Sequence, residues 1–347
     1  MKVGINGMGR IGRLALRAAL GAAERETTDP RADNRLQVVH LNELKGGAAA
    51  TAHLLAFDSV QGKWRADIAA EGEDSIRIDQ HRMGFSAHAA PGDIPWGELG
   101  VELVLECTGK FLTPETLQGH LDRGAKRVIV AAPVKVGNVL NIVVGVNDHL
   151  YNPARDRIVT AASCTTNCLA PVVKVLYDAF GLEYGLMTTC HSYTMDQRLL
   201  DGSHSDFRRA RAACLSMIPT STGAARAVTE VMPELAGRLD GLSVRVPTPN
   251  VSLVDLVATV TRPTSREEVN QAFVEAAAGF LTGVLDVSFE PLVSTDHNGS
   301  GFSAVVDAEL TNVLGGTLVK VMAWYDNEMG FANRMLDLAS YVGRHVV

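Results

Sequence analysis

The chain has 347 residues, of which 46% are hydrophobic and 20% charged, a composition typical of a globular protein with a substantial core. This length is sufficient for two domains. The formal net charge of -7 argues against nucleic acid as the main partner and gives no sign of binding to an anionic membrane. The five cysteines lack the paired spacing of disulfide frameworks and metal sites, so we expect no metal and a cytoplasmic location.

The first part of the chain alternates between short apolar segments and helical patterns. Strands are predicted over residues 2–6, 36–41, 103–107 and 128–130, and helices over residues 13–25 and 113–123, with a polar, turn-rich segment at 27–34. A strand, a glycine turn, a helix and a second strand in succession form a βαβ unit. We therefore predict an α/β domain with a doubly wound parallel sheet, of the Rossmann type. No apolar run reaches membrane-spanning length, and we expect no membrane partner.

The second part of the chain has longer predicted strands and fewer helices. Strands are expected at 187–190, 243–246, 251–260, 285–289 and 317–324, and helices at 169–180, 265–278 and 330–345. Ser265 and Glu268 form a capping box at the start of one of these helices. We predict an α+β catalytic domain with a mostly antiparallel sheet over residues 164–327, and a first domain over 1–163 and 328–347. Residues 192–214 are charged and aperiodic, so we interpret them as an ordered functional loop.

The glycine turn after the first strand carries a binding motif. Residues 7–12 read GMGRIG, which matches G-x-G-x-x-G between a strand and a helix. In this context Gly7 suits the tight turn, Gly9 lets a pyrophosphate approach the backbone, and Gly12 lets the helix pack on the strand. The helix N-terminus then faces the phosphates. The motif predicts a dinucleotide site.

The end of the second strand adds a polar pair to that site, Asn42 and Glu43. A carboxylate at Glu43 can accept hydrogen bonds from the adenosine ribose hydroxyls, and it would repel a 2′-phosphate. The cofactor is therefore predicted to be NAD rather than NADP. Arg10 and Ile11 of the glycine turn complete the cofactor-binding residues expected in this unit.

A cysteine stands between hydroxyl residues just before an apolar helical run, in the segment AASCTTNCLAP at 161–171. Unpaired N–H groups and the macrodipole at a helix start favour negative charge, so we expect the Cys164 thiol to ionise more easily and to act as a nucleophile. His191, further along the chain, is the candidate base. The remaining cysteines are predicted to be buried and inert; they are Cys107, Cys168, Cys190 and Cys214.

A nicotinamide cofactor beside a nucleophilic cysteine and a histidine indicates covalent oxidation of an aldehyde. The thiolate attacks the aldehyde, and the histidine removes the hydroxyl proton as hydride leaves for the nicotinamide. The product is a thioester, which conserves the energy of oxidation for transfer to a second nucleophile.

The chain resembles the phosphorylating glyceraldehyde-3-phosphate dehydrogenase family from end to end. The matching stretches are KVGINGMGRIGR (2–13), ASCTTNCLAP (162–171), HSYTMDQ (191–197), RRARAA (208–213), IPTSTGAA (218–225), VRVPTPNV (244–251) and WYDNEMG (324–330). The resemblance implies that Cys164 is the nucleophile and that His191 is the base, which also stabilises the oxyanion together with the backbone N–H of Cys164. It also implies a homotetramer, with the 192–214 loop near a subunit interface.

The resemblance further implies two anion sites and additional cofactor contacts. The substrate 3-phosphate would be held by Thr194 and Arg245, through a hydroxyl and a guanidinium group. The attacking phosphate would enter through a group of five residues: Ser163, Thr165, Arg208, Thr222 and Gly223. Asn327 would orient the nicotinamide carboxamide, and Thr108 and Gly109 form the loop beneath it.

The sequence departs from the family pattern near the expected cofactor site. Met8, Met329 and Phe331 stand where the family usually has Phe, Trp and Tyr, while Met195 and Ala131 replace other common residues. Ser203 resembles a serine of NADP-using relatives whose hydroxyl can meet the 2′-phosphate, so use of NADP is an alternative to NAD.

Other functions remain open at this point. Asn42, Glu43 and Phe331 also resemble erythrose-4-phosphate dehydrogenases, in which water takes the thioester, but the intact segment 220–223 favours phosphorolysis. Segments 42–47, 131–135 and 145–153 resemble a branch associated with arsenate efflux, in which arsenate would replace phosphate. A non-enzymatic redox sensor or scaffold is a further reading, against which the Cys164 and His191 pair argues.

Overall fold

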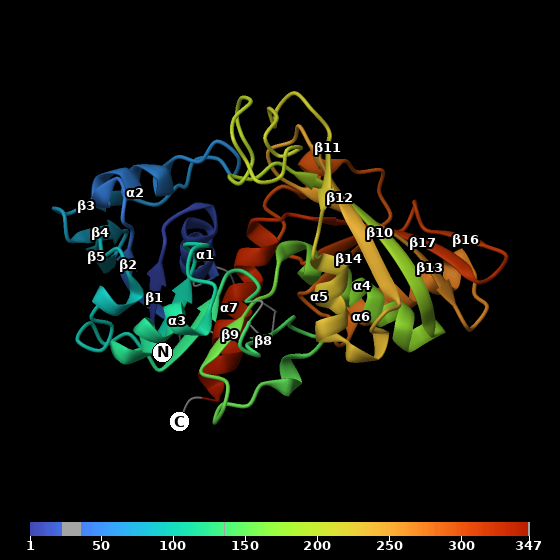
Figure 1. Ribbon diagram of the computed structural model, residues 1–347, viewed down its shortest axis with the longest axis horizontal. Helices are drawn as coiled ribbons and strands as arrows, with labels where there is room; N and C mark the ends of the chain where they lie inside the picture. Colours follow the sequence, from blue (N-terminus) through green and yellow to red (C-terminus); the bar gives the residue numbers. More distant parts are fainter. Residues whose placement is uncertain (23–35, 135, 346–347) are drawn as a thin grey trace. The chain divides into compact units, whose positions relative to one another are not determined.

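The structure is a computed structural model that describes residues 1–22, 36–134 and 136–345 (Figure 1). It divides into two compact units: unit 1 comprises residues 1–142, 148–162 and 332–347, and unit 2 comprises residues 143–147 and 163–331. The expected division differs from this one in three places. Residues 143–147 belong to unit 2, Ser163 opens the main part of unit 2, and that part ends at Phe331 rather than at Asn327.

Unit 1 contains a nine-stranded sheet in the order β3-β4-β5-β2-β1-β6-β7-β9-β8. Its strands are β1 (Lys2–Asn6), β2 (Gln37–Asn42), β3 (Ile68–Ala70), β4 (Ser75–Ile78), β5 (His81–Ser86), β6 (Leu103–Glu106), β7 (Arg127–Val130), β8 (Leu140–Asn141) and β9 (Ile158–Thr160). The central pairs are parallel, and β3 and β4 add an antiparallel edge. The predicted doubly wound α/β fold is therefore confirmed, although the sequence reasoning missed the small strands.

The helices of unit 1 follow the expected alternation. They are α1 (Arg10–Ala22), α2 (Gly47–Ala56), α3 (Pro114–Asp122) and α7 (Met329–Arg344), whose first residues belong to unit 2, with short 3-10 turns at Pro91–Asp93 and Asp148–Leu150. Helix α1 begins inside the glycine motif, earlier than predicted, and the expected end of this helix and the turn-rich segment 27–34 lie outside the described residues. Thr113 caps α3 by accepting a hydrogen bond from the backbone N–H of Thr116.

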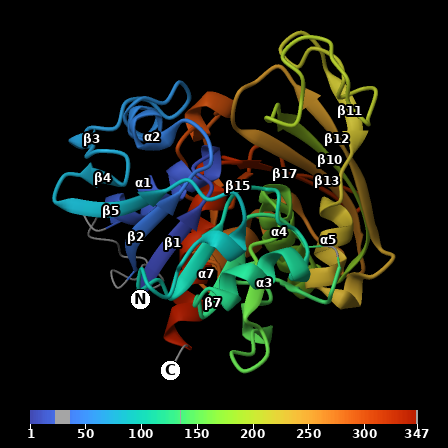
Figure 2. The ribbon, with the colours of Figure 1, turned by 60° about the vertical axis from the view of Figure 1, so that its left-hand side comes forward.

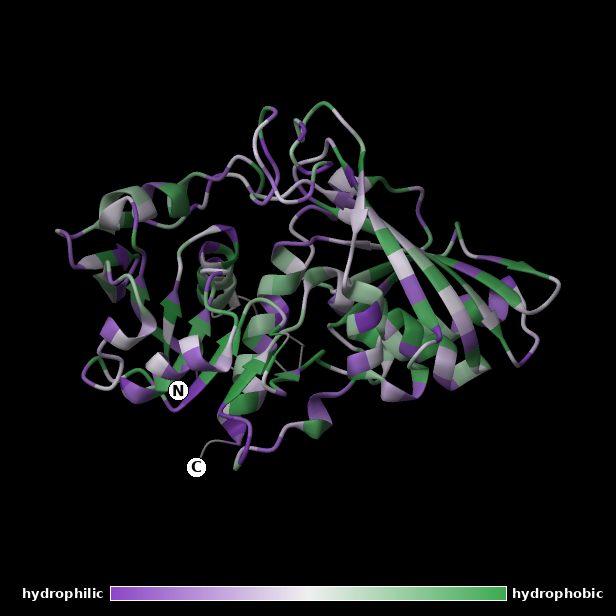
Figure 3. Ribbon diagram, viewed as in Figure 1, coloured by the Kyte–Doolittle hydropathy of each residue, from purple (hydrophilic) through white to green (hydrophobic). Residues whose placement is uncertain are grey.

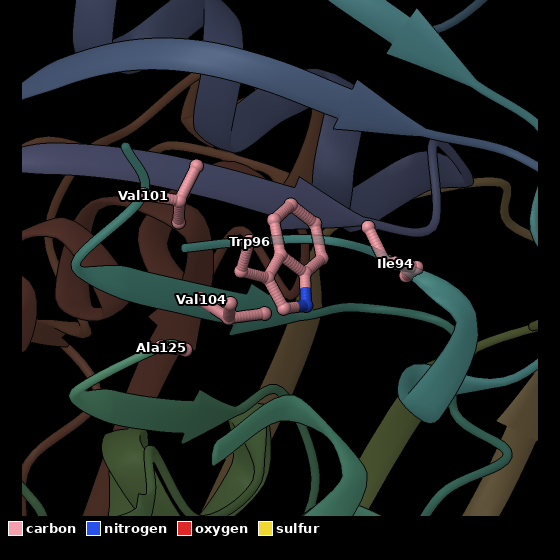
Figure 4. Close-up of a cluster of buried hydrophobic side chains, with 5 residues drawn as sticks. All are labelled: Ile94, Trp96, Val101, Val104 and Ala125. Carbon is pink, nitrogen blue, oxygen red and sulfur yellow. The ribbon is translucent and has the colours of Figure 1, made fainter. Parts of the chain in front are cut away.

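The central strands of unit 1 could be predicted from the sequence because they are buried and apolar. Strands β6 and β7 are buried and apolar over most of their lengths. In Figure 3 the central strands of this sheet are largely green, the colour of hydrophobic residues. A cluster of Ile94, Trp96, Val101, Val104 and Ala125 packs beside β1 and β6 (Figure 4). The Trp96 ring lies so close to Gly4 that a Cβ at that glycine would be 2.5 Å from it. A larger residue than glycine at position 4 would therefore displace Trp96.

Unit 2 contains an eight-stranded, mostly antiparallel sheet in the order β11-β12-β10-β13-β17-β15-β14, with β16 paired to β17. The strands are β10 (Leu182–Ser192), β11 (Ile218–Ser221), β12 (Leu239–Val246), β13 (Ser252–Val260), β14 (Leu285–Ser288), β15 (Ala304–Asp307), β16 (Asn312–Leu314) and β17 (Leu318–Tyr325). This confirms the predicted α+β class. Strands β11, β15 and β16 were not predicted, and β10 and β12 are longer than expected.

Helices α4 (Cys164–Phe180), α5 (Ala224–Val231) and α6 (Arg266–Ala278) cover one face of this sheet, as Figures 1 and 2 show. Helix α4 lies centrally and packs against β10, β13, β15 and β17. The predicted capping box at the start of α6 is present, because Ser265 Oγ accepts from the backbone N–H of Glu268 and the Glu268 side chain accepts in return. Short 3-10 turns lie at Pro233–Leu235 and Ser294–His297.

Within the described part of the chain, every helix is too short or too polar to span a bilayer. Among the same residues, His, Cys, Asp and Glu side chains do not gather in threes in a way that could hold a metal ion. The five cysteines are all free thiols. Of the four cysteines expected to be buried, only Cys168 is; Cys107 and Cys190 are half-buried, and Cys214 is exposed.

Candidate active site

The candidate nucleophile lies on the first residue of a central helix. Ser163 caps α4, and its Oγ accepts a hydrogen bond from the backbone N–H of Thr166 at 3.1 Å. Ala162, just before it, has a φ of 55°, a left-handed conformation that is uncommon for alanine. This sharp turn and the cap place Cys164 at the N-terminus of α4, as the sequence predicted.

The candidate base lies beside that sulfur. His191, near the end of β10, has its Nε2 at 3.5 Å from the Sγ of Cys164. Its Nδ1 is 2.7 Å from the carbonyl oxygen of Ser192, which can only accept a hydrogen bond, and 3.0 Å from Nη1 of Arg245, which can only donate one. Nη1 of Arg245 can donate to the Ser192 carbonyl oxygen instead, at 3.0 Å, so we assign the imidazole proton to Nδ1 on the basis of the shorter contact with that oxygen. This assignment leaves the Nε2 lone pair directed at Cys164, where it can take the thiol proton.

Electrostatics around this pair differ from the expectation based on the helix start. The protein atoms packed around the sulfur raise the pKa of the Cys164 thiol above its usual value. The Arg245 charge and the backbone N–H groups at the helix start act in the opposite direction, but they do not outweigh burial. The predicted lowering of the thiol pKa is therefore wrong for this structure. With its pKa raised, the candidate nucleophile would need His191 as a proton acceptor rather than ionise by itself.

Burial also determines the charge of the base. Burial and the neighbouring Arg245 charge lower the pKa of His191 from 6.5 to about 3, so the imidazole is neutral near pH 7. A neutral imidazole is the form that can accept a proton.

The lowered pKa of His191 predicts a pH dependence of stability. In the unfolded chain this histidine binds a proton near pH 6.5, and in the folded protein only near pH 3. Between these values the unfolded state binds more protons, so the free energy of unfolding should fall as the pH falls, by up to about 1.4 kcal/mol per pH unit from this group. Urea denaturation at pH 7, 6 and 5 would measure it.

The matched control for that experiment is H191N, which should reduce the slope. The slope should not vanish, because burial also lowers the pKa of His40 in unit 1 to about 4, and this has the same sign. An identical slope in wild type and H191N would contradict a neutral, buried His191.

A partly buried arginine lies next to the candidate base. Strands β10 and β12 are parallel neighbours, and their register pairs His191 with Arg245. Nη1 of Arg245 donates to the carbonyl oxygen of Ser192 at 3.0 Å and lies 3.5 Å from Oγ1 of Thr194. Nε of Arg245 is buried without a hydrogen-bond partner among the described residues. An unpaired guanidinium N–H beside a hydroxyl is suited to an anionic ligand.

The hydroxyl groups predicted to receive an attacking anion fall on two helix starts. Ser163 and Thr165 flank the sulfur, and Oγ1 of Thr165 is 2.9 Å from the buried hydroxyl of Tyr325. Gly223 is the N-cap of α5, and the preceding Thr222 accepts from the backbone N–H of Ala224 at 3.2 Å. These N-termini offer N–H donors and a favourable dipole to an anion.

The predicted dinucleotide residues of unit 1 meet at the carboxyl ends of three neighbouring strands. The register pairs Asn6 at the end of β1 with Asn42 of β2 and with Glu106 of β6. Nδ2 of Asn42 donates to Oδ1 of Asn6 at 2.8 Å. In open α/β sheets this edge is where ligands bind.

The glycine turn has the shape that a pyrophosphate needs. Gly7 has a φ of 94°, and a Cβ there would lie 2.7 Å from the backbone nitrogen of Thr108. A Cβ on Gly12 would be 2.0 Å from the carbonyl oxygen of Gly7, whereas one on Gly9 would meet nothing within 4 Å. Gly7 and Gly12 are therefore needed for packing, and Gly9 leaves open space at the helix start.

Polar contacts hold this turn in place. Oε2 of Glu43 accepts from the backbone N–H of Met8 at 2.8 Å, and Arg10 forms an ion pair with Asp58. The carboxylate of Glu43 thus lies at the turn, next to the place expected for a ribose. Ile11 follows in the first turn of α1.

A buried carboxylate supports the loop that contains Thr108 and Gly109. Glu106 accepts from Nδ2 of Asn6 at 2.5 Å, from the backbone N–H of Thr108 at 2.8 Å and from Nε2 of His120 at 3.0 Å. Nδ1 of His120 in turn accepts from the Trp96 indole at 2.9 Å. Sequence reasoning missed Glu106 and His120, because each looks like an ordinary residue of a strand end or a helix.

Comparison with known proteins covers both units. Residues 1–114 match the NAD binding domain of glyceraldehyde 3-phosphate dehydrogenase, and residues 163–327 match its C-terminal domain. Glyceraldehyde-3-phosphate dehydrogenase 3 of Nostoc sp. is 52% identical over 344 residues, which cover 99% of this chain and 98% of that protein. The chromosomal enzyme of Cupriavidus necator is 52% identical over 339 residues (98% and 97%), and enzyme 1 of Bacillus subtilis is 49% identical over 344 residues (99% and 98%).

The chain belongs to the glyceraldehyde-3-phosphate dehydrogenase family. This confirms the resemblance inferred from the motifs, and the family's NAD-binding domain confirms the predicted cofactor.

One residue that the motifs predicted for the attacking anion, Arg208, has fewer polar contacts than its neighbour. Arg208 is exposed, and its guanidinium is 3.4 Å from the carbonyl oxygen of Pro219. Its neighbour Arg209 donates to Oγ1 of Thr220 at 3.0 Å and pairs with Asp196 at 2.7 Å. The Arg209 charge also contributes to lowering the pKa of His191. On these contacts Arg209, which the sequence analysis did not name, replaces Arg208 as the candidate arginine for the attacking anion.

The remaining predicted residues and family departures are distributed over both units. Ser203 is exposed in unit 2, and its carbonyl oxygen accepts from Nε of Arg198 at 2.9 Å. Asn327, which follows β17, is buried and accepts a hydrogen bond from Ser252. Among the departures from the family pattern, Met8 and Phe331 are buried, whereas Met195 is 88% exposed.

Proposed function

We propose that this chain is an NAD-dependent oxidoreductase that converts D-glyceraldehyde 3-phosphate to 1,3-bisphosphoglycerate in a reversible, phosphorylating reaction. The observation that carries the proposal is the pair of Cys164 Sγ and His191 Nε2, 3.5 Å apart at a helix start. The relatives at 49% to 52% identity, which are named glyceraldehyde-3-phosphate dehydrogenases, support the choice of substrate. The partners are then the aldehyde and inorganic phosphate.

NAD fits the residues of unit 1, because a Cβ on Gly9 would meet nothing within 4 Å while Gly7 and Gly12 are closely packed. When bound, it supplies the hydride acceptor. We assign the pyrophosphate to the turn of Gly9 to Ile11 and the adenosine ribose to Asn42 and Glu43. Thr108, Gly109 and Asn327 are assigned to the nicotinamide.

Proton transfer in the first half-reaction is assigned to His191. Nε2 takes the thiol proton of Cys164 as the sulfur bonds to C1 of the aldehyde, and it returns the proton to the aldehyde oxygen. The backbone N–H of Cys164 supports the oxyanion in between. His191 removes the same proton again when the C1 hydride leaves, which turns the thiohemiacetal into a thioester.

The second half-reaction uses the anion-binding groups. Arg245 and Thr194 hold the 3-phosphate of the substrate, and the unpaired Nε of Arg245 is the donor available for it. The attacking phosphate is assigned to hydroxyls and helix N-termini at Ser163, Thr165, Thr222 and Gly223, with Arg209 in place of Arg208. A phosphate oxygen bonds to C1, the C–S bond breaks, and the Cys164 thiolate leaves.

Steady-state kinetics would test this function against its alternatives. Glyceraldehyde 3-phosphate and erythrose 4-phosphate would be compared with NAD and NADP, each with phosphate, with arsenate or with neither. We expect the highest kcat/KM with glyceraldehyde 3-phosphate, NAD and phosphate.

Each of the other possible kinetic results would favour a different function or cofactor. Equal rates without any oxyanion would refute phosphorolysis and favour a hydrolytic erythrose-4-phosphate dehydrogenase. A preference for arsenate over phosphate would favour an arsenate-specific role, with 1-arseno-3-phosphoglycerate as the product. Comparable rates with NADP would show that Ser203 outweighs Glu43 in choosing the cofactor.

The exposed loop between β10 and β11 supports a homotetramer. Six apolar side chains in this loop are 73% to 88% exposed: Met195, Leu199, Leu200, Phe207, Leu215 and Met217. So many exposed apolar groups in one segment mark an interaction surface. The loop is also held by internal ion pairs, Arg209 with Asp196 and Arg211 with Asp201. We propose that further copies of this chain cover it.

Replacing Leu200 and Phe207 with serine should therefore shift the assembly toward smaller species. Sedimentation velocity at micromolar protein would measure this shift. The control is Leu314→Ser, at a side chain that is 61% exposed but lies on β16, outside the loop. A wild-type chain that sediments as a monomer would overturn the proposal.

We also place the protein in the cytoplasm. The proposed mechanism needs Cys164 as a free thiol, and a reducing compartment keeps it in that state.

A further inference from the structure

A buried serine at the start of β13 connects two parts of unit 2. Ser252 is 2% exposed, and its Oγ lies 3.1 Å from the backbone nitrogen of Ser192 and 2.8 Å from Oδ1 of Asn327. Ser192 follows His191 in the chain, and Asn327 is the residue assigned above to the nicotinamide carboxamide. The hydroxyl group of Ser252 therefore contacts both Ser192 and Asn327.

The hydrogen-bond directions at this hydroxyl follow from its two partners. The backbone N–H of Ser192 can only donate, so Oγ of Ser252 accepts from it. The hydroxyl proton of Ser252 is then free to be donated, and Oδ1 of Asn327 accepts it. If the Asn327 amide were flipped, Oγ could accept from both neighbours, but the hydroxyl proton of Ser252 would lose its acceptor at 2.8 Å. The Ser252 hydroxyl thus determines that Oδ1 of Asn327, rather than Nδ2, faces Ser252.

This orientation has a chemical consequence. With Oδ1 engaged by Ser252, the Nδ2 group of Asn327 is the end available to a ligand, and it can only donate. A carbonyl oxygen, such as that of a nicotinamide carboxamide, is its complementary partner. The backbone around Asn327 is also held, because the carboxylate of Asp326 accepts from the backbone N–H groups of Glu328 and Met329.

The contact between Ser252 and the backbone N–H of Ser192 supports the end of β10, the strand that carries His191. Ser192 donates through its own Oγ to the carbonyl oxygen of Val251 at 2.7 Å, and its carbonyl oxygen accepts from both His191 and Arg245. Val251 has a φ of 65°, which is strained for a β-branched residue. Strain of this kind persists where surrounding contacts enforce it. Ser192 therefore lies between the hydroxyl of Ser252 and the atoms that orient the base.

We propose that Ser252 is a positioning residue that sets the amide orientation of Asn327, so that Nδ2 is presented to the nicotinamide carboxamide oxygen. This inference rests on the proposed function and deepens it. Ser252 touches neither substrate nor reacting atoms in this role, and it acts through Asn327.

The test compares S252A, N327A and the double variant S252A/N327A with wild type. NAD binding by isothermal titration and steady-state KM values would be measured, with a thermal melt to show that each variant is folded. S252A should weaken NAD binding and raise the KM for NAD by about tenfold, the effect of losing one buried hydrogen bond. The KM for glyceraldehyde 3-phosphate should rise less than the KM for NAD, because Ser252 contacts Asn327 directly but reaches Arg245 only through Ser192. On the N327A background, S252A should have little further effect.

The matched control is S303A, because Ser303 is also buried but its Oγ has no hydrogen-bond partner among the described residues. S303A should bind NAD as wild type does. If S252A does not fold, N327D provides the independent test, since it keeps an acceptor for Ser252 but loses the donor at Nδ2. N327D should lose NAD affinity as S252A does.

Several results would overturn the inference. Unchanged NAD affinity in S252A or N327D would do so, while normal wild-type kinetics left the proposed function intact. An equal rise in both KM values, or additive effects in the double variant, would show a general structural role instead. A wild-type chain that does not bind NAD would overturn both the inference and the proposed function.

Discussion

Replacing Cys164 with alanine is expected to abolish phosphorylating dehydrogenase activity, with kcat at least about 10⁴-fold below wild type. The reason is that the variant cannot form the thioester, and the other thiols in the described residues are not paired with a base as Cys164 is. Initial rates of NADH formation, followed by absorbance, would measure the loss. NAD affinity should remain close to wild type, because the glycine turn of unit 1 is unchanged.

Two controls make this result specific. Cys168→Ala removes a buried thiol from the same helix and should retain activity. Alkylation with iodoacetamide should inactivate the wild type in proportion to modification of Cys164, identified by mass spectrometry. Full activity after complete alkylation of Cys164 would eliminate the thioester mechanism.

His191→Asn should lower kcat by about 10² to 10⁴-fold, the usual contribution of a positioned general base. We expect this loss because burial raises the pKa of the Cys164 thiol, so that the thiol depends on a proton acceptor to form the thiolate. The rate of Cys164 alkylation at pH 7 should fall as well. The pH at which alkylation reaches half its maximal rate should move upward in the variant.

The comparison variant for His191 is H204N. This histidine is also in unit 2, and its ring lies 3.4 Å from Asp196, away from the sulfur contact. H204N should leave alkylation of Cys164 unchanged. If H191N and wild type were alkylated equally fast at pH 7, the assignment of Nε2 as the acceptor of the thiol proton would have to be abandoned.

Several elements could be predicted because their signals are local. The glycine turn at Gly7 and the cap of α6 at Ser265 each depend on residues within one helical turn. The start of α4 at Cys164 lies before the predicted helix at 169–180. Strands β6 and β7 could be recognised from continuous apolar runs. Short strands such as β15 and β16 escaped prediction, because they are defined by pairing with β17 rather than by their own residues.

The candidate site was predicted less completely than the fold. Cys164 and His191 were found from motifs, and the structure brings them together. The choice between Arg208 and Arg209 could not be made from two adjacent arginines in an irregular loop. It depends on the distant Thr220 and Asp196, which Arg209 contacts.

Local residue patterns were sufficient to predict the fold class, the dinucleotide motif, the candidate nucleophile with its candidate base, and the family. They suffice because backbone conformation, capping and chemical type depend on neighbours in the chain. Only the tertiary structure decided the direction of the Cys164 pKa, the roles of Glu106 and Arg209, and the link from Ser252 to Asn327. Burial and hydrogen bonding depend on groups that are far apart in sequence, and folding alone brings them into contact.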